Sequence, residues 1–179
     1  MKPEPAPPVT ADADNLSVDI DIGDDGWLAA LVEPEQFCSD VVRSVIGHLA
    51  LPARPYEVSV VLISDDRQRE LNRVYRGRDA ATNVLSFPSA ELDNTDFPPE
   101  LPLPLGDITL ALETITREAA DMAFRDHFCH LLVHGMLHLV GYDHETNDDA
   151  ACMEALEIRI LDARGVKNPY ADSVVTGQN

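Results

Sequence analysis

The chain has 179 residues, 45% apolar and 25% charged, which is typical of one folded domain in water. Its net charge of −19, from 32 acidic and 13 basic residues, disfavours non-specific attraction to nucleic acid. No apolar run approaches the roughly 18 residues of a membrane span, residues 1–15 lack a secretory signal, and the three scattered cysteines have no CxxC spacing. We therefore expect a cytoplasmic protein with free thiols, no membrane association and no cysteine-based zinc site.

The hydrophobic pattern predicts a single domain over residues 16–168, between a disordered acidic, Pro-rich tail over 1–15 and a C-terminal tail over 169–179. Alternating or β-branched runs predict strands at 16–22, 56–64, 82–89 and 105–113. Apolar residues at helical spacing, with polar starts or glycine stops, predict helices at 33–51, 65–77, 125–140 and 147–165. A long acidic, Pro-rich loop is expected over 90–104, and Pro88 indicates an edge or an end for the third strand. The interleaved order predicts an α+β domain with a small sheet packed on helices.

Three of the six histidines fall within residues 134–144, in an otherwise apolar segment. On a helix, His134 and His138 are one turn apart, so their imidazoles lie on one face about 6 Å apart and can reach one metal ion. Gly141 permits the left-handed turn that ends such a helix, and the chain can then return His144 from a loop. Three protein ligands with an open fourth position are typical of a catalytic zinc site. The pattern therefore predicts a metal ion held by these three histidines.

His130 is a rival ligand, because it also lies one turn from His134. It lies two turns, about 12 Å, from His138, so one ion cannot take all three from a straight helix. We interpret His130 and His127 as supporting or core groups. A core role is the usual explanation for a single histidine on a buried helix, but a pair at i and i+4, followed by glycine and a third histidine, favours a metal.

Residues 67–78 carry five of the 13 basic residues and reverse the charge of the chain locally. Two sets of side chains fall on opposite sides of the predicted helix: Arg69, Arg73 and Arg76 on one, and Leu71, Val74 and Tyr75 on the other. We therefore expect the helix to pack through the second set and to present an arginine row. Arginine binds phosphate oxygens bidentately. The alternative is a solvated face paired with nearby acids.

The stretch HGMLHLVGYDH, residues 134–144, resembles the HGxLHLxGYDH signature of the YbeY family of bacterial rRNA maturation endoribonucleases. YRGRDAATNVLSFP and LGDITL resemble the family's second and third motifs, and the similarity extends over about residues 56–170, with MEALE and NPY near its end. It implies a mixed four-stranded sheet with about five to six helices around it and a metal site at a helix end. The family's zinc-binding histidines map onto His134, His138 and His144, and its functionally important arginine maps onto Arg76.

The resemblance implies metal-dependent, single-strand-specific RNA cleavage in maturation of the 3′ end of 16S rRNA and in ribosome quality control. One Zn2+ per chain is the implied cofactor. The implied partners are precursor 16S rRNA, the small ribosomal subunit, a small-subunit ribosomal protein and the GTPase Era. Arg76 is the expected catalytic residue, and RNA contacts are expected from Arg69, Arg73 and Arg78. The chain departs from the family at Ala80 and Ala81, where lysine and proline are common, and in its strong negative charge, which suits docking on a basic ribosomal protein.

Three functions are therefore weighed. In the first, the protein is an endoribonuclease in which Arg76 stabilises charge on the phosphate; either a metal-activated water or the ribose 2′-hydroxyl is the nucleophile. In the second, it is a non-catalytic ribosome-assembly factor whose zinc is structural, so that metal removal should unfold the domain. A zinc peptidase ranks last, because Gly135 stands where such enzymes place their general base.

Overall fold

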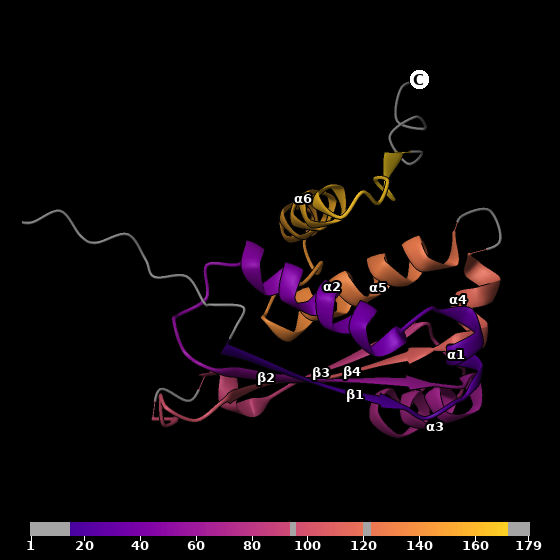
Figure 1. Ribbon diagram of the computed structural model, residues 1–179, viewed down its shortest axis with the longest axis horizontal. Coiled ribbons are helices and arrows are strands. Elements are labelled where there is room, and N and C mark those ends of the chain that lie inside the picture. The colour runs from indigo at the N-terminus through magenta and orange to yellow at the C-terminus, as the bar shows by residue number, and fades with distance from the viewer. Residues whose placement is uncertain (1–14, 94–95, 120–122, 172–179) are drawn as a thin grey trace, which may run out of the picture.

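The structure is a computed structural model that describes residues 15–93, 96–119 and 123–171 (Figure 1). The elements follow in the order β1 Leu16–Ile22, α1 Gly26–Ala30, α2 Pro34–His48, β2 Tyr56–Ile63, α3 Asp65–Arg76, β3 Val84–Pro88, the 3-10 helix η2 Ala90–Asp93, β4 Leu103–Ala111, α4 Leu112–Glu118, α5 Phe124–Leu139 and α6 Asn147–Ala163. The predicted tails fall mainly on residues 1–14 and 172–179, which lie outside the described residues, so the tails and the domain limits stay predictions. Residues 94 and 95 of the predicted 90–104 loop lie outside them too.

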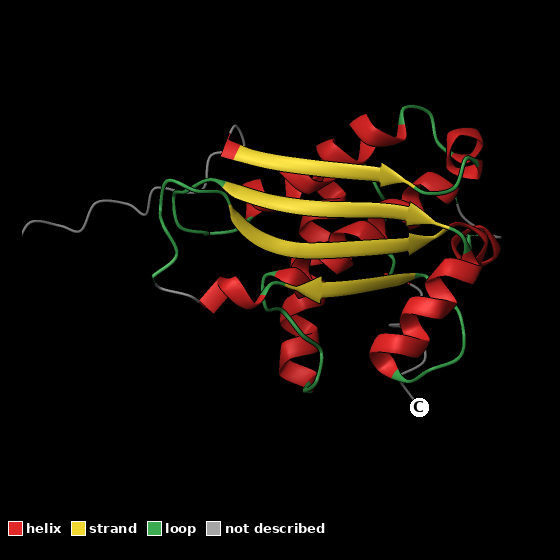
Figure 2. Cartoon of the chain, turned by 90° about the horizontal axis from the view of Figure 1, so that it is seen from below, coloured by secondary structure: helices red, strands yellow, loops and turns green. Residues whose placement is uncertain are grey.

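The four strands form one mixed sheet in the order β1-β2-β4-β3. The strands β1, β2 and β4 run parallel, and β3 runs antiparallel to β4 at one edge (Figure 2). Pro88 ends this edge strand, where a missing backbone N–H costs no ladder hydrogen bond. The predicted α+β class with a mixed four-stranded sheet is confirmed, and six α-helices surround the sheet in the described part of the chain.

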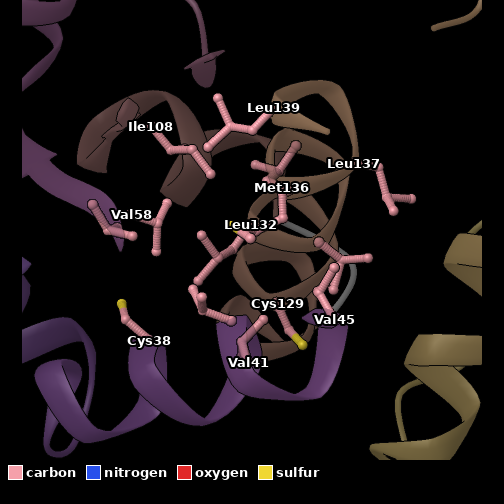
Figure 3. Close-up of a cluster of buried hydrophobic side chains, with 14 of the residues drawn as sticks. Cys38, Val41, Val45, Val58, Ile108, Cys129, Leu132, Met136, Leu137 and Leu139 are labelled. Atoms are coloured by element: carbon pink, nitrogen blue, oxygen red, sulfur yellow. The ribbon is translucent and has the colours of Figure 1, made fainter. Parts of the chain in front are cut away.

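The helices form layers on both faces of the sheet. In Figure 1, α2 and α5 cover one face, α6 lies beyond them, and α3 lies on the opposite face. The helix α5 is apolar nearly all round because it is enclosed by the sheet, α2 and α6; within it Leu132, Met136 and Leu137 have no exposed surface. All three belong to one hydrophobic core; Figure 3 shows Leu132 and Met136 among side chains of α2 and of the strands, whereas Leu137 points away from these elements. The helix that carries two of the predicted metal ligands is therefore rigidly held.

Gly135 lies where α5 packs closely on the sheet. A Cβ at this position would lie 3.1 Å from Ser86 Oγ, 3.2 Å from Ile108 Cγ2 and 3.3 Å from Val84 Cγ2. Ser86 Oγ also donates a hydrogen bond of 3.1 Å to the Gly135 carbonyl oxygen. The absence of a side chain at residue 135 thus fixes the helix against β3 and β4.

The helix α3 packs differently from the prediction. Its buried side chains are the polar Gln68 and Asn72, whereas Val74 and Tyr75 are 63% and 66% exposed. The Gln68 side chain pairs with Thr109 on β4, accepting from its hydroxyl at 2.7 Å and donating to its carbonyl oxygen at 3.3 Å. The expectation that Val74 and Tyr75 form the packing face is wrong, because α3 packs through Gln68 and Asn72 while Val74 is exposed and Tyr75 only meets the edge of the Phe87 ring, with the centroids 5.1 Å apart.

Candidate metal site

The end of α5 and the turn after it bring three histidines together. The helix ends at Leu139, and Gly141 adopts a positive φ of 91° that lets the chain reverse. The Tyr142 N–H bonds back to the Leu137 carbonyl oxygen at 3.0 Å, and the loop then returns residue 144 to the helix end. The backbone N–H of His144 donates to Asp143 Oδ1 at 2.7 Å, which fixes the loop where the third histidine projects.

The side chains of His134, His138 and His144 form a compact cluster. One nitrogen from each lies within 4.8 Å of the others, and the Nε2 atoms of His134 and His138 are 3.0 Å apart. Nitrogen ligands of one tetrahedral zinc ion lie about 3.3 Å from each other, given metal–nitrogen bonds of about 2.0–2.1 Å. Burial lowers the pKa of His138, and the neighbouring His134 and His144 lower it further. Neutral imidazoles at this spacing are a donor set that could hold one metal ion.

A buried carboxylate lies directly behind the first ligand. His134 Nδ1 is 2.7 Å from Glu157 Oε1, on α6, and this glutamate is 1% exposed. Burial alone would raise its pKa, but hydrogen bonds from His130, His134 and Tyr170 outweigh burial and hold the pKa at about 2. Sequence analysis missed Glu157 and Tyr170, because only the fold brings the MEALE and NPY segments against α5.

The other two histidines of α5 lie outside the cluster. His127 Nε2 is 3.0 Å from Glu118 Oε2. His130 Nε2 is 3.3 Å from the Tyr170 hydroxyl and 3.4 Å from Glu157 Oε2. Neither belongs to the group that could bind an ion, in agreement with the interpretation of both as supporting groups.

An open cavity of about 510 Å3 lies in front of the histidine cluster. Its walls come from four segments of the chain and are lined by Arg76, Ser86, Pro88, His138, Gly141, Tyr142, Asp143 and His144. Arg76, the last residue of α3, thus reaches a cavity that is also lined by His138 and His144 of the histidine cluster. A phosphate group in this cavity could meet a guanidinium and a metal ion together.

The other arginines of the predicted row do not line this cavity. Arg69 donates two hydrogen bonds to the carboxylate of Asp79, at 2.8 and 2.9 Å, and this contact raises the pKa of Arg69 and lowers that of Asp79. Arg73 and Arg78 are exposed. Pairing with a nearby acid, the alternative weighed above, therefore holds for Arg69, and only Arg76 shares the cavity with the histidines.

Comparison with known proteins places these features in a family context. The family model described as Endoribonuclease YbeY matches residues 30–165. A curated Endoribonuclease YbeY from Paramagnetospirillum magneticum is 44% identical over 161 residues, which cover 88% of this chain and 97% of the relative. The corresponding protein from Rhodospirillum rubrum is 48% identical over 150 residues, covering 82% and 74%, and that from Agrobacterium fabrum is 42% identical over 164 residues, covering 87% and 95%. None of the helices in the described residues has the length and apolar character to cross a membrane.

Proposed function

Because the chain belongs to the YbeY endoribonuclease family, we propose that it is a cytoplasmic, zinc-dependent endoribonuclease that cleaves single-stranded RNA in the cavity between Arg76 and the histidine cluster. One Zn2+ per chain is the proposed cofactor, held by His134, His138 and His144. The observation that carries the proposal is the shared cavity, because phosphodiester cleavage needs a positive group beside the metal.

The residues of the cavity have separate roles in this proposal. When bound, the ion supplies Lewis-acid chemistry: it withdraws charge from phosphate oxygens and makes water a stronger acid. Arg76 binds the phosphate and stabilises the negative charge that builds on its oxygens. The open mouth of the cavity admits an extended strand, and His144, which is exposed, leaves one side of the cluster accessible to it.

The proposed substrate is precursor 16S rRNA at its 3′ end, with a further role in ribosome quality control. The proposed partners are the small ribosomal subunit, one of its proteins and the GTPase Era. The net charge of −19 supports docking through a basic protein, since the chain as a whole repels RNA. A partner that delivers the RNA would overcome this repulsion.

A non-catalytic assembly factor with a structural zinc is the second candidate. The cluster does link α5 to the following loop, as a structural ion would. Against it, structural zinc sites are usually closed by four protein ligands, whereas this group has three and opens on a cavity. The core also extends through α2, α5, α6 and the sheet without contribution from the cluster.

The structure disfavours a zinc peptidase for a steric reason. A glutamate at residue 135 would place its Cβ within 3.3 Å of three atoms on β3 and β4. Each of these distances is tighter than most Cβ contacts in proteins, and a glutamate side chain would begin among the side chains of the sheet. The usual peptidase base could therefore be placed here only if the neighbouring side chains on β3 and β4, or α5 itself, shifted.

The proposal is tested by cleavage of RNA carrying the precursor 16S 3′ end. Arg76→Ala is expected to lower kcat/KM by about 100- to 1,000-fold, the loss typical of one group that stabilises transition-state charge. Arg69→Ala is the matched control: it removes an arginine from the same helix that is already paired with Asp79, and should change the rate by less than about threefold. His138→Ala should lose both bound zinc and cleavage. Equal cleavage by all four proteins would indicate a contaminating nuclease and would sink the proposal.

A further inference from the structure

Glu157 is the buried acid that the proposed reaction does not use. It projects from α6 toward α5 and is 1% exposed. His134 Nδ1 reaches its Oε1 at 2.7 Å, and the Tyr170 hydroxyl donates to its Oε2. His130 Nε2 lies 3.4 Å from the same Oε2. Three donors from two segments thus converge on one carboxylate.

The chemistry of these groups determines which ring nitrogen of His134 carries hydrogen. A buried carboxylate is stable as an ion only when its oxygens receive hydrogen bonds. Because an ionised carboxylate can only accept, His134 must donate through Nδ1. The neutral ring then keeps a lone pair on Nε2, the nitrogen that lies 3.0 Å from His138 Nε2 inside the cluster.

Tyr170 holds the carboxylate from its far side. Beyond α6 the chain folds back over α5, and the Tyr170 N–H bonds to Asn168 Oδ1 at 2.8 Å, which fixes the turn. The Tyr170 ring packs edge-on against His130, with the centroids 5.6 Å apart. Tyr170 lies beyond residue 165, the last residue that the family model matches.

We propose that Glu157 is a positioning residue that fixes His134 as the Nδ1–H tautomer for metal binding, and that Tyr170 keeps Glu157 in place from the C-terminal segment. This inference rests on the metal site of the proposed function. Outer partners of metal-ligating histidines commonly orient the ring in this way, and their loss costs about 10- to 100-fold in metal affinity. Here that partner is itself held by a residue outside the metal-binding motif.

Two readouts that need no RNA test the inference. Zinc affinity is measured by competition with a chromophoric chelator, and the tautomer of His134 is read from nitrogen NMR of the imidazoles in metal-free protein. Glu157→Ala should weaken zinc binding about 10- to 100-fold and shift His134 toward the Nε2–H form. Asp162→Ala, which removes an exposed acid near the C-terminal end of the same helix, should leave both readouts unchanged.

Tyr170→Phe tests the proposed role of Tyr170. It also tests the inference in the case that Glu157→Ala does not fold. It removes one hydroxyl and should weaken zinc binding by about 3- to 10-fold, at or below the low end of losses for outer partners of metal ligands, with a parallel change in the His134 signal. Unchanged affinity and an unchanged tautomer in this folded variant would overturn the inference. RNA cleavage by the parent protein reports separately on the proposed function, so the failure of one is distinguishable from the failure of the other.

Discussion

At the scale of single residues, the placement of the site depends on a glycine as much as on the histidines. Gly135 lies between the two clustered histidines of α5, His134 and His138, and faces Val84 and Ser86 on β3. A side chain here would require the neighbouring side chains of the sheet, or the helix with His134 and His138, to shift. Gly135 thus has a packing role at the position where zinc peptidases carry a glutamate.

Valine substitutions of two helical glycines, Gly135 and Gly47, test this role. Gly135→Val is expected to lower the free energy of unfolding by about 1–3 kcal/mol, the usual cost of overpacking a tight core. Gly47→Val is the control, because a Cβ on Gly47 in α2 meets no atom within 4 Å, and should change stability by less than about 0.5 kcal/mol. Urea unfolding of the two variants and the parent measures both. Equal stability of the two variants would contradict the close approach of α5.

The sequence was informative about the histidines because their signal is local. An i, i+4 pair followed by glycine and a third histidine is visible within eleven residues, and the structure brings these side chains together. Glu157 gives no such signal, because its contact with His134 spans 23 residues and depends on how α6 packs on α5. Only the resemblance to the family singles out Arg76, because nothing in the sequence around it distinguishes it from Arg69.

At the scale of elements, the patterned segments were predictable and the short helices were not. All four strands and the helices α2, α3, α5 and α6 begin and end within about three residues of their predicted limits. The helices α1 and α4 were missed. The helix α4 follows β4 without a break, and its start is held by Asp65 of α3, whose carboxylate accepts from the Thr114 N–H at 2.9 Å. Because this capping residue is distant from α4 in the sequence, the residues around the start of α4 do not indicate a helix.

The face of α3 was predicted wrongly, and its true packing can be tested by stability. Gln68→Ala removes the partner of the buried Thr109 hydroxyl and should lower the free energy of unfolding by about 1–3 kcal/mol. Val74→Ala shortens a side chain that is 63% exposed and should cost less than about 0.5 kcal/mol. Chemical denaturation of both variants and of the parent protein measures these changes in the free energy of unfolding. A larger loss of stability for Val74→Ala than for Gln68→Ala would support the apolar packing face that the sequence pattern predicted.

At the scale of the whole molecule, the charge limits how RNA can be bound. The chain carries −19 overall, and four arginines are expected to contact RNA: Arg69, Arg73, Arg76 and Arg78. Of these four, Arg69 is hydrogen-bonded to Asp79 in the described structure, which leaves three. Three phosphate contacts on a single strand give a slope of log K against log salt of about −2. Binding titrations with a short single strand at several salt concentrations should therefore give a slope no steeper than this. A much steeper slope would indicate a basic surface that the structure does not present.

The central claim is that the histidine cluster holds the ion that cleaves RNA. Its most direct test is a titration of metal-free protein with zinc, in which RNA cleavage and circular dichroism are followed in the same samples. We expect cleavage to rise linearly to one ion per chain while the dichroism spectrum stays that of a folded protein throughout. A metal-free protein that is unfolded, and that folds on zinc addition without gaining cleavage, would contradict this account and establish the ion as structural.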